Sequence, residues 1–492
     1  MNRPLAFVTV NSLLAAPFVA AAPLGLFKGP LDVGVLSRPT IASYDAATAT
    51  YTISASGDNM WAQRDAFGFV AKQASGDLSL TADISLLGNS AQGHRKAALM
   101  FRQSLAPDSA YVDVAVHGDG LASLQFRSAS GAVTREIQCP VHAPKRVRLE
   151  KRGDYVLLAV AGSDGGLTPS GCAIRVALEG TFYVGLAVCA HDNTAFETAT
   201  FSRVELGEAA ASPGGRTSAL EIIPLASLDR RVVYRSAERI ESPHFSRDGS
   251  SVFFNSGGRI RRLILAEAET PEPVDTGFAT QCTAAHGLSP DGTTLVITDV
   301  SQTRQRVLYT VPVAGGVPTR INVPSPATWR SWSPDGQTLA YSAERDGNVD
   351  IFTTPLGGGV ENRLTTAEAR DDGADYTADG QWIYFHSDRA EHFQIWRMHT
   401  DGSSQQQVTN DAFLNWFPHP SPDGKSIVFL SGTTAAVDGR PAVGDYFLRQ
   451  YTIESGEIRE LARFYGGPGT LDVPSWSPDG TRLAYVSYEP AR

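Results

Sequence analysis

A short turn motif, Ser-x-Asp-Gly with Thr once in place of Ser, occurs six times in the second half of the chain. Successive copies are separated by 43, 44, 44, 44 and 56 residues, and their aspartates are Asp248, Asp291, Asp335, Asp379, Asp423 and Asp479. A period near 44 residues is typical of one four-stranded blade of a β-propeller. In such a turn Asp accepts backbone N–H groups and Gly takes a positive φ, so we expect all six aspartates to be structural.

The last repeat leaves too little chain for a complete blade. Only residues 473–475 and 482–487 are strand-like there, whereas two strand-like runs, 220–225 and 231–234, precede the first repeat. We expect these earlier runs to supply the outer strands, because pairing the chain end with the chain start removes exposed sheet edges. The pattern predicts a six-bladed propeller over residues 218–492.

The first half of the chain lacks the repeat but alternates strand-like runs with turns. This spacing favours a β-sandwich over residues 23–208. In the run 111–116, alternation places three valines on the core face and Tyr111 and Asp113 on the other face. The polar stretch 209–217 is the predicted linker, and the whole chain is predicted to be all-β.

Residues 1–22 have the pattern of an export signal: a basic start, an apolar run and small residues before Pro23. No other run reaches the roughly 18 apolar residues that a membrane span needs. We therefore expect a periplasmic or secreted monomer without a membrane span.

Composition excludes some classes of function. The net charge is −10 and Lys and Arg form no block, so we expect no nucleic acid partner. GxSxG, P-loop and HExxH motifs are absent from the sequence. The three cysteines of the first half either include a disulfide or are separate buried thiols, and they are Cys139, Cys172 and Cys189.

Two segments of the repeat carry a family resemblance. Pro-Ser-Trp-Ser-Pro-Asp-Gly at 474–480 resembles the repeat of TolB-like β-propellers, and Asn-Trp-Phe-Pro-His-Pro-Ser-Pro-Asp-Gly at 415–424 resembles a signature of exported bacterial TolB-like proteins. In the first half, Asn-Met-Trp at 59–61, Ser-Gly-Asp-Leu at 75–78 and the run 96–102 together resemble the concanavalin A-like jelly-roll superfamily. The resemblances imply a concanavalin A-like jelly roll followed by a six-bladed TolB-like propeller.

The innermost strand of a blade lines the central channel, and here it precedes each repeated turn. Alternation directs one residue of each such strand into the channel. These residues are His244, Gly287, Ser331, Asp375, His419 and Ser475, with His286 and Arg330 one position earlier at the mouth. One interpretation is a catalytic site of His244, His419, Asp375 and Arg330, or a divalent metal such as Ca or Mn held by His244 and His419. The other is that these groups hydrogen-bond channel water.

A second resemblance bears on catalysis. Oligogalacturonate lyases are TolB-like propellers whose channel histidines hold a metal and which cleave acidic sugars by β-elimination. His244 and His419 occupy positions similar to those histidines, but Ser331 and Ser475 stand where the lyase pattern requires further histidines.

Loops at the same mouth supply candidate substrate-binding residues, namely His286, His386, Arg389, Asn415 and Trp416. Trp416 either stacks on a sugar or packs under its loop. The adjacent Asp371 and Asp372 are interpreted as a solvated turn rather than a glycosidase acid and base. On the sandwich, Trp61, Arg102 and Tyr111 form either a glycan-binding face or ordinary surface.

The preferred function is recognition of a carbohydrate or of an envelope protein partner at the propeller mouth. The alternatives are a polysaccharide lyase or glycoside hydrolase at that mouth, and a TolB-like envelope scaffold.

Overall fold

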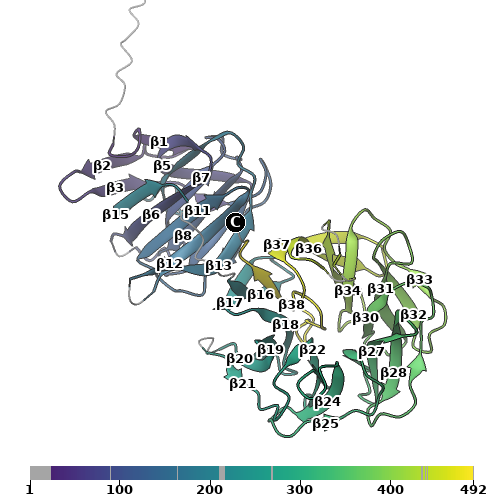
Figure 1. Cartoon of the computed structure of the whole chain (residues 1–492). Helices are drawn as coiled ribbons and strands as arrows, with labels where there is room; N and C mark the ends of the chain where they lie inside the picture. Colours follow the sequence, from purple (N-terminus) through teal and green to yellow (C-terminus); the bar gives the residue numbers. More distant parts are fainter. Residues whose placement is uncertain are drawn as a thin grey trace, which may run out of the picture.

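The computed structural model describes residues 24–490 except 89, 163–164, 210–216, 267–269, 434–435, 438 and 440. All regular elements within these residues are β-strands, in two bodies joined side by side (Figure 1). The predicted export signal, residues 1–22, and most of the predicted linker lie outside the described residues. None of the described segments is a helix long and apolar enough to cross a membrane.

The first body is a sandwich of two sheets. Its first layer runs in the order β1-β5-β14-β7-β8-β9-β10, with β4 paired to β5. The strands are β1 (Pro30–Val33), β4 (Asn59–Trp61), β5 (Arg64–Ser75), β7 (Lys96–Arg102), β8 (Tyr111–His117), β9 (Ala122–Arg127), β10 (Arg135–Gln138) and β14 (Thr181–Cys189).

The second layer is a seven-stranded sheet in the order β13-β12-β11-β6-β15-β3-β2. Its strands are β2 (Ile41–Asp45), β3 (Thr50–Ala55), β6 (Leu78–Leu86), β11 (Arg146–Arg152), β12 (Tyr155–Ala161), β13 (Leu167–Arg175) and β15 (Glu197–Gly207). The two layers enclose one apolar core that contains Val112, Val114 and Val116, so the predicted core face of this strand is confirmed. Strand pairing establishes a two-layered sandwich and leaves the concanavalin A-like assignment a prediction.

The second body contains five four-stranded blades within the described residues. The first two are β18 (Ile240–Phe245), β19 (Ser251–Ser256), β20 (Arg259–Ile264) and β21 (Glu272–Pro273), then β22 (Cys282–Leu288), β23 (Thr294–Asp299), β24 (Val307–Pro312) and β25 (Thr319–Arg320). The third and fourth are β26 (Thr328–Trp332), β27 (Thr338–Arg345), β28 (Asn348–Pro355) and β29 (Asn362–Arg363), then β30 (Asp371–Tyr376), β31 (Trp382–Ser387), β32 (Gln394–His399) and β33 (Gln406–Gln407). The fifth is β34 (Leu414–Pro420), β35 (Ser426–Gly432), β36 (Gly444–Thr452) and β37 (Ile458–Gly466).

The two ends of the propeller half pair with each other, as the sequence predicted. β38 (Arg482–Tyr488) pairs with β16 (Ser218–Pro224), which pairs with β17 (Arg230–Ser236). The prediction of six separate blades is not confirmed, because these strands are not an independent sheet. β17 also pairs in parallel with β10, so they extend the first layer of the sandwich into an eleven-stranded sheet.

This parallel pairing forms the seam between sandwich and propeller. The register joins Ile137 to Arg230 and Gln138 to Arg231. Ala219 and Val232 of the propeller half are buried in the core of the sandwich, so the two bodies share apolar packing at the seam.

Candidate functional site

The repeated turns close the innermost hairpin of each blade. In every copy the Asp carboxylate accepts the Ser or Thr hydroxyl and the backbone N–H two residues later. The glycine that follows has a positive φ, between 67° and 72°. Because both predicted features are present, the structural role of these aspartates is confirmed.

Each of the innermost strands β18, β22, β26, β30 and β34 is irregular just before its turn. The register of every one of these pairings shifts there by a bulge. Ser242 and Phe417 take a positive φ at two of the shifts, which is uncommon for residues with a Cβ. Bulges re-aim side chains, and they determine which residues reach the channel.

A cavity of about 340 Å³ opens at the turn face of the propeller and draws its walls from all the repeats. Its rim carries the residues at the variable position of the turns, which are Arg247, Pro290, Pro334, Ala378, Pro422 and Pro478. Large side chains lie below the rim, namely Phe245, Leu288, Trp329, Trp332, Tyr376 and Trp476. The cavity lining also includes polar residues, namely His244, Ser246, Arg247, His286, Asp375, Thr377, Ser421 and Ser477, so it is mixed in character.

Two buried histidines supply the most unusual of these polar groups. His244 and His286 both line the cavity, and their ring centroids are 5.0 Å apart. The two ring nitrogens of His286, which is fully buried, have no hydrogen-bond partner among the described residues, whereas the ring of His244, which is 4% exposed, interacts with the backbone of Ser242. Burial lowers the pKa of His244 to about 3 and that of His286 well below its usual value, so both rings are neutral at pH 7. The unpaired nitrogens of His286 lie in the cavity wall and are buried, so a ligand reaches them only if the neighbouring side chains move.

Asp375 and His419 form a closed pair next to these histidines. His419 Nδ1 lies 3.0 Å from Asp375 Oδ2, and its Nε2 lies 2.9 Å from the carbonyl oxygen of Leu471. Burial raises the pKa of Asp375. Neither ring nitrogen of His419 is free for a metal ion.

The metal predicted at His244 and His419 would need His419 to break one of these bonds. Within the described residues no group of three or more His, Cys, Asp or Glu is arranged to hold a metal ion. The donor set therefore does not fit such a metal as it stands. The metal and its catalytic use stay predictions, and we derive no step from them.

Arg330 does not line the cavity, and its charge is neutralised by a carboxylate of β30. Its guanidinium lies 2.6 Å from Asp372, which also contacts Arg370 at 3.3 Å. Burial raises the pKa of Asp372, but these two cations lower it well below its usual range. The interpretation of Asp371 and Asp372 as a solvated turn was wrong: both are buried on β30, because each carboxylate has an arginine partner.

The remaining mouth residues are mostly internal. Trp416 is fully buried in an apolar cluster, so the predicted stacking on a sugar is wrong and its packing alternative holds. Asn415 is also buried and accepts the hydroxyl of Ser431. Arg389 binds Asp371 at 2.6 Å. His386 is 1% exposed, and its Nδ1 accepts the backbone N–H of Phe417.

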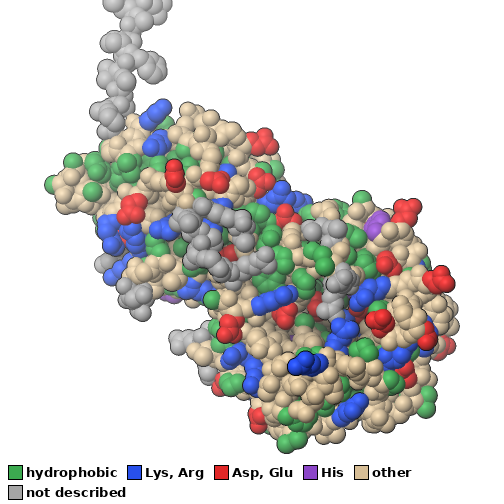
Figure 2. Space-filling model, in the orientation of Figure 1, with side chains coloured by type: hydrophobic (Ala, Val, Ile, Leu, Met, Phe, Trp, Pro, Cys, Tyr) green, Lys and Arg blue, Asp and Glu red, His purple; other side chains and the backbone are tan. Residues whose placement is uncertain are grey.

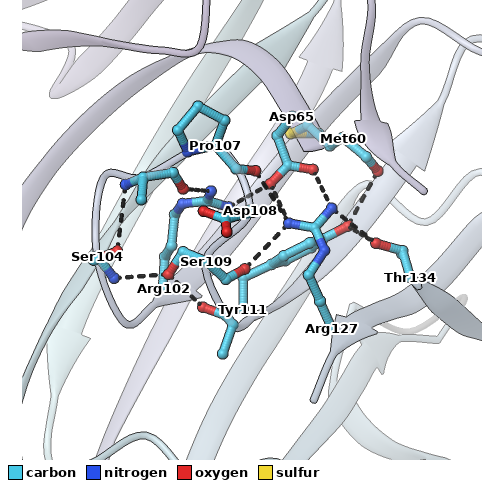
Figure 3. Close-up of polar contacts among 12 residues, drawn as sticks. Met60, Asp65, Arg102, Ser104, Pro107, Asp108, Ser109, Tyr111, Arg127 and Thr134 are labelled. Carbon is cyan, nitrogen blue, oxygen red and sulfur yellow. Dashed lines mark hydrogen bonds and ion pairs between the residues drawn. The ribbon is translucent and has the colours of Figure 1, made fainter. Parts of the chain in front are cut away.

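On the sandwich, the predicted glycan-binding face is covered. Arg102 and Tyr111 are fully buried: the Tyr111 hydroxyl donates to the carbonyl oxygen of Met60 in β4, and Arg102 donates to that of Ala106 in the loop after β7. Asp65 binds Arg102 and Arg127 in a buried triad (Figure 3). Trp61 is half-buried, and Lys96 lies 5.4 Å from the centre of its ring. Arg102 and Tyr111 therefore hold the sandwich together rather than facing solvent.

Arg247 and Trp329 line the cavity although neither was predicted to do so. Arg247 donates to the carbonyl oxygens of Ser289 and Leu288 and is the one charged residue at the variable rim position. That position holds Pro in four copies and Ala in one, so the departure at Arg247 was a usable signal. Trp329 is placed by its bulge, which no periodicity reveals.

Glycine is needed at position 287 because Trp329 fills the space beside it. A Cβ built there would lie 2.1 Å from the Trp329 ring. We expect Gly287→Ala to lower the free energy of unfolding by about 1–3 kcal/mol, since the buried ring must shift. Urea denaturation measures this. Gly357→Ala is the control, because its Cβ would meet nothing within 4 Å, and equal stability of the two variants would contradict the packing at Gly287.

Acid should weaken the propeller through His244 and His286. Their pKa values in the folded state lie below the unfolded value of 6.5, so the unfolded chain binds more protons below pH 6.5. The free energy of unfolding should fall as the pH decreases from 6.5 toward 3, by up to about 1.4 kcal/mol per pH unit for each histidine. Urea denaturation at pH 7, 6 and 5 should show a smaller fall for the double variant His244→Phe, His286→Phe. An equal fall in the free energy of unfolding for the wild type and the double variant would contradict the burial of both rings in their neutral form.

Comparisons with known proteins agree with the β-propeller fold of the second body. The TolB beta propeller domain family matches residues 322–439. The uncharacterized protein Atu1656 of Agrobacterium fabrum is 42% identical over 279 residues, which are 56% of this chain and 95% of that protein. This chain belongs to the TolB-like β-propeller family.

Solved TolB-like structures extend the comparison. The putative TolB from Agrobacterium tumefaciens is 42% identical, with a TM-score of 0.54, and the match covers 56% of this chain and all of that one. An oligogalacturonate lyase in complex with manganese is 16% identical, with a TM-score of 0.35, and the match covers 55% of this chain and 74% of that one. A likeness that low carries no argument about activity.

Proposed function

We propose that this TolB-like protein is an exported recognition protein that binds a segment of a partner protein in the cavity at its propeller mouth. The observation that supports this most is the cavity itself, which has a mostly proline rim with one arginine and has His286, with its two unpaired and buried ring nitrogens, in its wall. Buried polar atoms without partners are rare in native proteins, and a ligand is one of the few explanations for them.

The chemistry of the rim favours a protein segment over a sugar. Three of its prolines, Pro334, Pro422 and Pro478, are exposed, and aromatic residues line the cavity beneath them. Trp332 and Trp476 each donate their ring N–H to a backbone carbonyl of the preceding blade. Both residues are also buried, with 8% and 9% exposure, so little of either ring is open to a sugar, whereas apolar side chains of an extended peptide suit the prolines of the rim.

We further propose that β38, β16 and β17 serve as a sixth blade. The bridge between Trp476 and Leu483 adds an inner edge to this set, and Ser477 and Pro478 complete the cavity rim. The mouth would then be a closed ring, as a recognition site of fixed shape requires. Export is part of this proposal and rests on the pattern of residues 1–22.

Site-specific photocrosslinking tests the proposal in cells of the organism that produces this protein. A photoreactive residue in place of the exposed rim residue Pro334 should yield one defined protein adduct. Val317, which is 76% exposed on an outer hairpin, is the matched control and should yield none. Adducts from both positions, or from neither, would overturn the proposal.

A second assay distinguishes carbohydrate binding from lyase activity. Incubation with polyuronic acids should give no unsaturated product that absorbs in the ultraviolet, and glycans should not change the protein's Tm. A product would move the assignment to the lyase alternative, and a Tm shift without a product would move it to carbohydrate recognition.

A further inference from the structure

Two cysteines from opposite layers of the sandwich meet beside the seam. Cys139 directly follows β10 in the first layer, and Cys172 lies on β13 in the second. Cys172 Sγ is 3.9 Å from the carbonyl oxygen of Gln138, the residue before Cys139. The two side chains are in hydrogen-bonding contact and pack in the same core. They are thus placed as neighbours by strands about 30 residues apart.

The other two cysteines have different surroundings. Cys189 Sγ lies 3.4 Å from the carbonyl oxygen of Gly57, and Cys282 Sγ lies 3.6 Å from that of Ala279 in the propeller. Burial raises the pKa of Cys189 to about 11 and that of Cys282 to about 12. Both are inert buried thiols.

We propose that Cys139 and Cys172, which are thiols in this structure, are a disulfide-forming pair that fastens the two layers of the sandwich beside the propeller seam. Cys139 sits one residue beyond the pairing of Gln138 with Arg231. Gly171, next to Cys172, packs against Ala219 and Val232 of the propeller half. A bond between the two cysteines would therefore act at the point where three sets of strands meet.

The exposure of the two thiols determines which of them reacts first with an oxidant. Cys139 is half-buried, and the hydrogen bond from Cys172 lowers its pKa, so its thiolate is the attacking group. It attacks one sulfur of the disulfide of a small oxidant such as oxidised glutathione, and the other sulfur leaves as a thiol. Cys172 then loses its proton and attacks Cys139 Sγ, releasing the second thiol. Two thiols of this chain are oxidised and one disulfide of the oxidant is reduced.

Oxidation of the purified full chain tests the pair directly. After treatment with oxidised glutathione and unfolding in guanidinium, two of the four thiols should remain reactive toward a thiol reagent. Tryptic cleavage separates the pair into peptides 136–145 and 153–175, each with one cysteine, so a linked peptide identifies the bond by mass. The oxidised chain should melt about 5 °C above the reduced chain, because the bond restricts the unfolded state.

Variants separate this pair from other thiol reactions. Cys139→Ser and Cys172→Ser should each abolish the linked peptide and the Tm difference, whereas Cys189→Ser should keep both. Four reactive thiols after oxidation, glutathione retained on Cys139, or a bond that includes Cys189 or Cys282 would overturn the proposal. None of these results depends on whether the propeller mouth binds a partner.

Discussion

Replacing Asp65 by Ala should lower the free energy of unfolding of the sandwich by about 3–5 kcal/mol, because two buried arginines lose their counter-ion. Asp65 Oδ2 lies 2.6 Å from Arg102 and its Oδ1 lies 2.7 Å from Arg127, and no side chain of the three is exposed. Tyr111 lies between the two guanidiniums, 5.6 and 5.0 Å from its ring centre (Figure 3). Chemical denaturation followed by far-ultraviolet circular dichroism measures the loss.

Asp108→Ala is the matched control, because Asp108 belongs to the loop after Arg102 and its side chain binds Ser130 at the surface. Its effect should stay within about 0.5 kcal/mol. Asp65→Asn should fall between the two, since it keeps the shape and loses the charge. Wild-type stability of Asp65→Ala would contradict the buried triad.

Glu221→Ala should destabilise the propeller by a similar amount, about 3–5 kcal/mol. Glu221 is fully buried on β16, where it binds the Arg230 guanidinium at 2.7 and 2.8 Å and accepts the hydroxyls of Tyr485 and Ser487 from β38. These contacts tie the chain end to the chain start. Amide hydrogen exchange should therefore rise first in β38 and β16.

Glu460→Ala controls for the loss of a carboxylate. Glu460 is exposed and pairs with Arg463 three residues later, so its removal should cost less than about 1 kcal/mol. Exchange in β38 should stay at the wild-type rate in this variant. If Glu221→Ala also leaves β38 protected, closure of the ring does not depend on these contacts.

The fold followed from local patterns to a large extent. The Asp-Gly turns, the valine face of β8 and the pairing of β16 with β38 were all predicted. Turn type and strand alternation depend on residues that are close together in the sequence, so the sequence reveals them. The joining of β17 to β10 was not predicted, since a parallel pairing between distant strands leaves no local signature.

The site was predicted less well, and for a specific reason. The five described innermost strands each contain an irregularity, which shifts the register by one residue in four of them and by two in β22, and local alternation does not predict such shifts. Burial caused the other errors: Trp416 and Arg102 have residue types typical of binding sites, but partners from other strands enclose them.

Acidic and basic side chains are mixed over both bodies on the face shown in Figure 2. Charge on this face therefore does not single out a docking surface, and the distinctive region is the propeller mouth. Recognition at this mouth depends on the cavity and on the unpaired ring nitrogens of His286 in its wall.

Calorimetric titration of the partner segment identified by crosslinking, as a synthetic peptide, tests that account most directly. His286→Phe should weaken binding at least about tenfold, the loss of one or two hydrogen bonds, while leaving Tm unchanged or higher, because the ring nitrogens have no partner within the protein. Trp61→Ala on the sandwich should bind as wild type does. Unchanged affinity in His286→Phe, or a loss confined to Trp61→Ala, would contradict recognition at the propeller mouth.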